Sequence, residues 1–218
     1  MGSCDSVIVL KIVIRLLYGK FVDILRKERD IMKHSEFLKL YWKQYISLER
    51  DLINMSDYVD IDSKNYGCFS NNFAKIFMMA CSELDSLAEV FARIVKEDRS
   101  ENGKMPITFP QKINMLLYEY PNLSNKRVST RKSVCNLNFV PFSNFKENEV
   151  GDWWKDYNLV KHNRTGSKSE GKYNYEKANL KNTMMSLAAL FLLCCLISEY
   201  IDEKAKLEPD SCLFYYEG

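Results

Sequence analysis

The chain has 218 residues, which is enough for one domain, with or without an added helical arm, and for a substantial buried core. Its hydrophobic fraction of 46% is typical of a folded protein, and its formal net charge of +2 excludes a strongly acidic or basic chain. Seven cysteines occur without a CxxC pair or regular spacing, which argues against a metal knuckle or a disulfide framework. Their odd number favours a reducing compartment, so we expect a cytoplasmic protein.

An apolar run at residues 7–18 opens the chain. Two basic residues interrupt it, no basic segment precedes it, and no small-residue cleavage site follows, so it does not match a signal peptide. We expect residues 1–34 to form an N-terminal helical arm, residues 35–208 a helical bundle, and residues 209–218 a C-terminal tail.

Two amphipathic helices are predicted next. Residues 36–59 carry apolar side chains at helical spacing with charges between them. After a loop marked by aspartates and Gly67, Ser70 is a suitable N-cap for a helix from Asn71 to about Glu97, which has the clearest helical pattern in the chain.

The pattern weakens between residues 98 and 148, where glycine and prolines interrupt it. Only a short helix near 111–118 is predicted there. Alternation between Val134 and Asn138 indicates a short strand or an extended loop. Aromatic residues at 139–145 favour burial, so we do not expect a linker between separate domains.

A last long helix is predicted at 175–206, with Asn174 as its cap and Pro209 after its end. Its middle is apolar on nearly every side, so it should be central. The polar-free part, 187–197, is too short to span a bilayer, and no membrane partner is expected. The chain as a whole predicts an all-α fold, a helical bundle of four or five long helices with an irregular insertion.

The segment 153–164 is the one place where the sequence suggests chemistry. It belongs to a predicted tryptophan-rich helix that starts at residue 147 or 148 and runs to 163, before a Gly- and Ser-rich segment, 165–172, that is flexible by composition. Asn158 and His162 stand four residues apart, so a helix places their polar tips on one face. Imidazole exchanges its proton near neutral pH, which suits proton transfer.

Aromatic and basic residues surround this pair. Trp154 and Tyr157 would offer stacking faces for RNA bases, with core packing as the alternative explanation for at least one aromatic residue. Lys155, Lys161 and Arg164 would contact phosphates, although exposed cations are common on any protein surface.

Glu83 and Asp85 lie in an otherwise apolar helix, where a carboxylate needs a partner. We expect one of them to reach the end of the tryptophan-rich helix that carries Lys161, His162 and Arg164; an exposed acidic stripe is the alternative. No phosphate-binding glycine loop, Walker motif, HExxH zinc site or GxSxG elbow is present, and no cofactor or metal is expected.

These residues resemble the HEPN superfamily, the helical domains of bacterial toxins, abortive-infection proteins and RNA-cleaving defence systems. Asn158, three spacer residues and His162 are similar to the family's motif of Arg, polar residue, spacer and His at the end of a late helix. The segment 82–85 is similar to acidic patches in relatives, and the resemblance would cover about residues 36–206. One residue departs from the motif: Tyr157 stands where the family has Arg.

The resemblance implies a HEPN-like, homodimeric RNA-binding protein in a bacterial defence or toxin-antitoxin setting, with an antitoxin or defence protein as a further partner. Its enzymatic version is a metal-independent endoribonuclease, in which His162 is the general acid or base and Asn158 orients it or the phosphate. Arg164 or Lys161 would stabilise the developing charge, because Tyr157 cannot. The alternative is a non-catalytic HEPN-like module that binds a nucleotide, RNA or protein partner.

Overall fold

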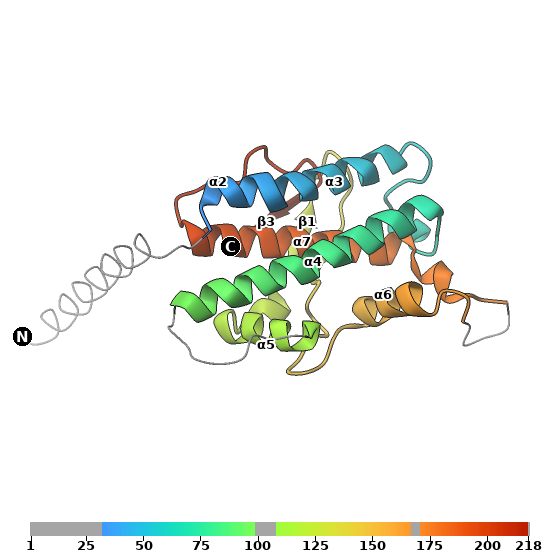
Figure 1. The fold of residues 1–218 in the computed structure, drawn as a ribbon. Coiled ribbons are helices and arrows are strands. Elements are labelled where there is room, and N and C mark those ends of the chain that lie inside the picture. Colours follow the sequence, from blue (N-terminus) through green and yellow to red (C-terminus); the bar gives the residue numbers. More distant parts are fainter. Residues whose placement is uncertain (1–31, 99–107, 167–170, 218) are drawn as a thin grey trace, which may run out of the picture.

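The computed structural model describes residues 32–98, 108–166 and 171–217 (Figure 1). The expected N-terminal arm, 1–34, therefore lies almost wholly outside the described residues, as does the middle of the Gly- and Ser-rich segment. The described chain is mostly helical and carries a small three-stranded antiparallel sheet. An all-α fold is thus confirmed in its coarse form, and the sheet is an addition to it.

The first helical stretch is continuous through α2 (His34–Phe37), a π-helical turn η1 (Leu38–Trp42) and α3 (Lys43–Met55). It begins two residues before the predicted 36–59 helix and ends four residues before its end. Its inward side chains include Trp42 and Tyr45, whose rings stack with their centroids 4.7 Å apart. A short 3-10 turn η2 (Ser63–Asn65) follows in the connection to the next helix.

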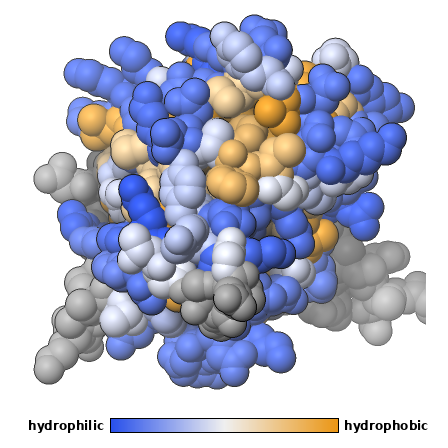
Figure 2. Space-filling view, turned by 90° about the vertical axis from the view of Figure 1, so that its right-hand side faces the viewer, coloured by the Kyte–Doolittle hydropathy of each residue, from blue (hydrophilic) through white to orange (hydrophobic). Residues whose placement is uncertain are grey.

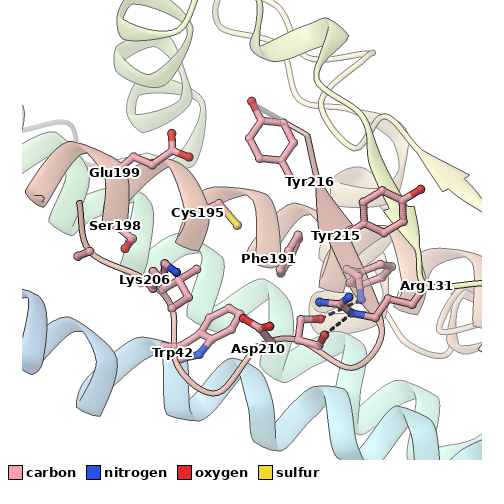
Figure 3. Close-up of a pocket in the computed structure, with 14 residues that line it drawn as sticks. Trp42, Arg131, Phe191, Cys195, Ser198, Glu199, Lys206, Asp210, Tyr215 and Tyr216 are labelled. Carbon is pink, nitrogen blue, oxygen red and sulfur yellow. Dashed lines mark hydrogen bonds between the residues drawn. The ribbon is translucent and has the colours of Figure 1, made fainter. Parts of the chain in front are cut away.

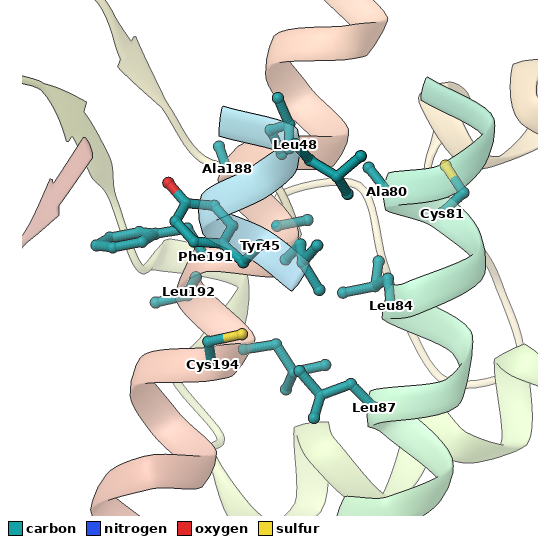
Figure 4. Close-up of a cluster of buried hydrophobic side chains, with 14 of the residues drawn as sticks. Tyr45, Leu48, Ala80, Cys81, Leu84, Leu87, Ala188, Phe191, Leu192 and Cys194 are labelled. Atoms are coloured by element: carbon teal, nitrogen blue, oxygen red, sulfur yellow. The ribbon is translucent and has the colours of Figure 1, made fainter. Parts of the chain in front are cut away.

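The longest helix, α4 (Asn71–Asp98), begins where the sequence predicts. The Ser70 hydroxyl accepts a hydrogen bond from the Phe73 backbone N–H at 3.1 Å, so it satisfies one of the free donors of the first turn. The buried face of α4 carries small and branched apolar residues, Ala80 and Leu84 among them, that pack toward α7 and α3 (Figure 4).

Next comes α5 (Phe109–Glu119), slightly longer than predicted, with a 3-10 turn η3 (Leu123–Asn125) after it. The buried Lys112 fastens α5 to α4, because its ammonium donates to Asp85 Oδ1 at 2.8 Å and to Glu89 Oε2 at 3.1 Å. Burial alone lowers the pKa of Lys112, but the hydrogen bonds and charges of these two carboxylates outweigh it and raise the pKa.

The central helix, α7 (Leu180–Ile201), is shorter at both ends than predicted. Asn179, not Asn174, caps it by accepting the Asn182 N–H at 3.0 Å, because residues Asn174–Lys177 form a separate 3-10 turn, η4. Among the described residues, α7 is the one helix long and apolar enough to cross a membrane, and 72% of its most apolar window is buried inside the protein. This burial agrees with the predicted core helix.

The sheet has the order β2-β1-β3, with β1 (Val128–Thr130) between β2 (Asn138–Phe139) and β3 (Phe214–Tyr216). Of the two structures predicted for residues 134–138, a short strand or an extended loop, the strand is confined to Asn138, because residues 131–135 form a turn and residues 136–137 have no regular structure.

Within the predicted C-terminal tail, 209–218, residues Phe214–Tyr216 form β3 and pair with β1. The buried Glu49 carboxylate of α3 holds this end of the chain by accepting the backbone N–H groups of Cys212 and Leu213 at 3.1 and 2.9 Å. It also accepts the Tyr45 hydroxyl at 2.9 Å and the Ser211 hydroxyl. Four donors thus satisfy a carboxylate that lies away from water.

Candidate nucleic-acid interface

The tryptophan-rich helix is α6 (Asp152–His162), and it begins four or five residues later than predicted. Its N-cap is Gly151, which packs so closely on Phe145 that an added Cβ would lie 2.5 Å from the ring. In Figure 1, α6 lies beside α4 and its C-terminal end points to the same end of the molecule as the loop between α3 and α4.

The inward face of α6 is built from Trp153, Trp154, Tyr157 and Val160, all buried. Trp154 is 5% exposed and stacks on Phe109 of α5, with the ring centroids 3.4 Å apart and the planes 9° from parallel. The indole N–H of Trp153 donates to the Pro141 carbonyl at 2.8 Å. These contacts make the tryptophans part of the core.

Tyr157 also faces the core and is 5% exposed. Its ring meets Phe77 of α4 edge to face, with the centroids 6.1 Å apart. Burial, with smaller contributions from Cys81 and Asp85, raises the pKa of Tyr157 to about 12. The expected role of Trp154 and Tyr157 as open stacking faces for bases therefore does not fit their positions: both rings are already covered by protein.

The outward face carries the polar residues. Asn158, Lys161, His162 and Arg164 are all exposed, and we refer to these four as the α6-end cluster. Lys161 places its Nζ atom 5.5 Å from the centre of the Tyr157 ring, so a buried aromatic ring holds an exposed cation near His162. Lys155 lies farther toward the start of the helix, exposed and paired with Asp152 at 3.3 Å.

A hydrogen-bonded network fixes α6 against the start of α7. The Asp156 carboxylate accepts Lys177 Nζ at 2.6 Å through Oδ1 and Asn182 Nδ2 at 3.0 Å through Oδ2. Asn182 also donates to the Lys177 carbonyl at 2.8 Å. All three side chains are partly or fully buried, so the polar outer face of α6 stands on a rigid support.

The turn after α6 is held just as firmly. Asn174 donates through its side chain to the Asn163 carbonyl at 2.8 Å and through its backbone to the Gly166 carbonyl, also at 2.8 Å. The Tyr175 N–H donates to the Arg164 carbonyl at 3.1 Å. The sequence predicts Asn174 as the cap of the last helix, so these hydrogen bonds to the turn after α6 were missed.

The two acidic residues predicted to support the site lie elsewhere. Asp85 pairs with Lys112 of α5 and not with the α6-end cluster. Glu83 lies two positions after Cys81 and therefore on nearly the opposite side of α4. Its charge contributes to raising the pKa of the buried Cys194 of α7. Partial burial raises the pKa of Glu83 above its usual value.

Cys81 marks the side of α4 that α6 covers. Burial raises the pKa of the Cys81 thiol well above its usual value, and the nearby Lys161 ammonium opposes that rise only in part. The thiol is therefore a protonated, apolar packing group below the site, not a nucleophile.

A separate cavity of 290 Å³ lies between the C-terminal end of α7, β3 and the 205–211 loop (Figure 3). It contains none of the residues predicted as functional. Arg131 on its wall donates through Nε to the Ser211 carbonyl at 2.6 Å, and Glu199, Lys206 and Asp210 also line the cavity. Within residues 32–98, 108–166 and 171–217, no group of three or more His, Cys, Asp or Glu side chains could hold a metal ion.

Comparisons with protein-family models, with curated proteins and with solved structures find no match to this chain.

Proposed function

We propose that this chain is a HEPN-like RNA-binding protein that binds RNA phosphates at the α6-end cluster and cleaves the RNA without a metal ion, with His162 as the proton-transfer group. The observation that supports the proposal is the exposure of an imidazole, an amide and two cations at one helix end, on a support of partly buried hydrogen bonds. Cations and an amide that project from one fixed helix end can contact a phosphate together.

The chemistry needs few groups. The ribose 2′-hydroxyl attacks the adjacent phosphorus, the bond from phosphorus to the 5′ oxygen breaks, and one proton leaves the attacking oxygen while another reaches the leaving oxygen. His162 accepts the first proton, Asn158 orients the imidazole or the phosphate, and Lys161 or Arg164 stabilises the negative charge on phosphorus. The second proton transfer calls for a second group, which the second His162 of a homodimer would supply.

The test compares the wild type with His162→Ala on a labelled single-stranded RNA in the presence of a chelator. We expect the wild type to cleave the RNA and the variant to bind it with similar affinity but cleave it about 100- to 10,000-fold more slowly, the range of general acid–base contributions. Equal cleavage by both proteins would remove His162 from the reaction. Sedimentation of the wild type should show a dimer.

A matched control removes the same charge elsewhere. Lys39 and Lys43 are exposed on η1 and at the start of α3, toward the other end of the molecule (Figure 1). The double variant Lys39→Ala/Lys43→Ala should bind RNA like the wild type, whereas Lys161→Ala/Arg164→Ala should bind it more weakly. An equal loss of RNA affinity in the two double variants would mean that the affinity depends only on the net charge of the protein.

A non-catalytic module is the second candidate, and one observation favours it. The position where the resembled family has Arg is held by Tyr157, whose ring is buried against Phe77. No cation can replace it there without leaving the core. RNA binding without cleavage by either the wild type or His162→Ala would select this candidate.

A further inference from the structure

Phe69 is one of the exposed aromatic residues at the same end of the molecule as the α6-end cluster, and Tyr173 is another. Phe69, just before α4, is 47% exposed. Figure 2 looks onto this end and shows mainly hydrophilic residues with a smaller hydrophobic area among them. Single exposed apolar side chains are common on protein surfaces, so what distinguishes Phe69 is its fixed orientation and its neighbours.

The Phe69 ring is held in one orientation by its neighbour Tyr175. The two rings meet edge to face, with their centroids 5.9 Å apart and their planes at 87°. Tyr175 is itself fixed, because its hydroxyl donates to Asn71 Oδ1 at 2.6 Å. The backbone of Phe69 is fixed as well, through a β-bridge to Asn179 before α7. An aromatic surface that is ordered before a ligand arrives loses little entropy on binding.

The same tyrosine links Phe69 to the cationic turn. The Tyr175 N–H donates to the Arg164 carbonyl at 3.1 Å, while its ring touches Phe69. Phe69 is thus one residue removed from the turn that carries Arg164. Single-stranded RNA is commonly held by cations on its phosphates and by aromatic rings against its bases, and Tyr175 connects one group of each kind here.

We infer that Phe69 stacks on an unpaired base of the RNA whose phosphate lies at the α6-end cluster, and that the ligand is therefore single-stranded. This inference rests on the proposed function of that cluster. It also replaces the expected stacking residues: Trp154 and Tyr157 are buried, whereas Phe69 keeps an open face.

The test measures the affinity of four proteins for three oligonucleotides of equal length. The proteins are the wild type, Phe69→Ala, Phe69→Leu and Lys161→Ala/Arg164→Ala; the ligands are a single-stranded RNA, its duplex, and the same ribose-phosphate chain without bases. We expect the wild type to prefer the single strand to both other ligands. Phe69→Ala and Phe69→Leu should lose about 5- to 100-fold in affinity for the single strand and nothing for the abasic chain.

Phe69→Leu retains an apolar side chain of similar size, so a loss shared by both variants is not a folding defect. Tyr173→Ala is the matched aromatic control: Tyr173 is 59% exposed in the connection between α6 and α7, and its ring contacts no other aromatic ring among the described residues. It should lose less affinity than Phe69→Ala. A larger loss in Tyr173→Ala, or unchanged RNA affinity in Phe69→Ala, would overturn the inference.

A second readout reports stacking directly. In Phe69→Trp, the added indole fluorescence should be quenched when the single-stranded RNA binds and unchanged when the abasic chain binds. The two proposals fail differently. Wild-type affinity that is the same for RNA and the abasic chain would end the stacking role and leave the phosphate site in place, while no RNA binding at low salt would end both.

Discussion

Trp154 and Asn158 lie four residues apart on α6, yet the indole is stacked in the core and the amide is exposed to water. The aromatic residues of this stretch are buried, whereas Asn158, Lys161 and His162 are exposed. The comparison teaches that one short segment, which reads as a single cluster in the sequence, separates into a face that stabilises the fold and a face available for binding. Substitutions on the two faces should therefore have opposite signatures.

The largest effect is expected on the inward face. Trp154→Ala removes a buried indole stacked on Phe109 and leaves a cavity between α5 and α6, which should lower the free energy of unfolding by about 3–5 kcal/mol. Denaturant titration measures it. Lys155→Ala, on the exposed face next to it, should change the free energy by less than about 0.5 kcal/mol.

Tyr157 gives a sharper version of the comparison, because the resembled family has Arg at its position. Tyr157→Arg would restore the family residue but bury a cation against Phe77, and it should cost about 3 kcal/mol of stability without raising RNA cleavage. Tyr157→Phe retains the ring contacts and should cost less than about 1 kcal/mol. A stable, more active Tyr157→Arg would show that the ring can leave the core and that this face is functional.

The outward face should respond in binding and not in stability. Lys161→Ala/Arg164→Ala removes two phosphate contacts, so the slope of log affinity against log salt should become shallower by about 1.4 for a single strand. Its unfolding midpoint in denaturant should match the wild type within error. An unchanged slope would mean that neither cation touches a phosphate.

The smallest effect concerns Glu83, whose pKa partial burial raises above the usual value of 4.5. The charged form is disfavoured in the folded state, so Glu83 lowers stability progressively as pH rises through the interval between the usual and the raised pKa. Glu83→Gln should therefore match the wild type at pH 4 and be slightly more stable at pH 7, as read from denaturation midpoints. A less stable Glu83→Gln at pH 7 would reveal a favourable partner for the carboxylate.

Local signals carried most of what the sequence predicted correctly about the fold. Ser70 before an apolar pattern located the start of α4, and continuous apolarity located α7 as the central helix. The missed features depend on contacts between distant residues. Nothing near Phe214 indicates that it pairs with Thr130, and nothing near Asp85 indicates that it binds Lys112 instead of another cation.

The candidate site divides in the same way. Helical spacing places Asn158 and His162 on one face, and the structure exposes both. The direction of that face depends on the packing of Trp154 and Tyr157, which sequence alone left open between core and stacking roles. No signal in the sequence indicated Phe69, because it is far from α6 in the chain and is linked to the α6-end cluster only through Tyr175.

Chemical-shift mapping tests the central claim most directly, because the inward and outward faces of α6 can be followed in one titration with single-stranded RNA. We predict that the imidazole of His162 and the backbone amides of residues 161–166 shift on RNA addition, while the indole N–H signals of Trp153 and Trp154 stay in place. Shifts of the tryptophan signals with an unchanged His162 would contradict the assignment of the two faces.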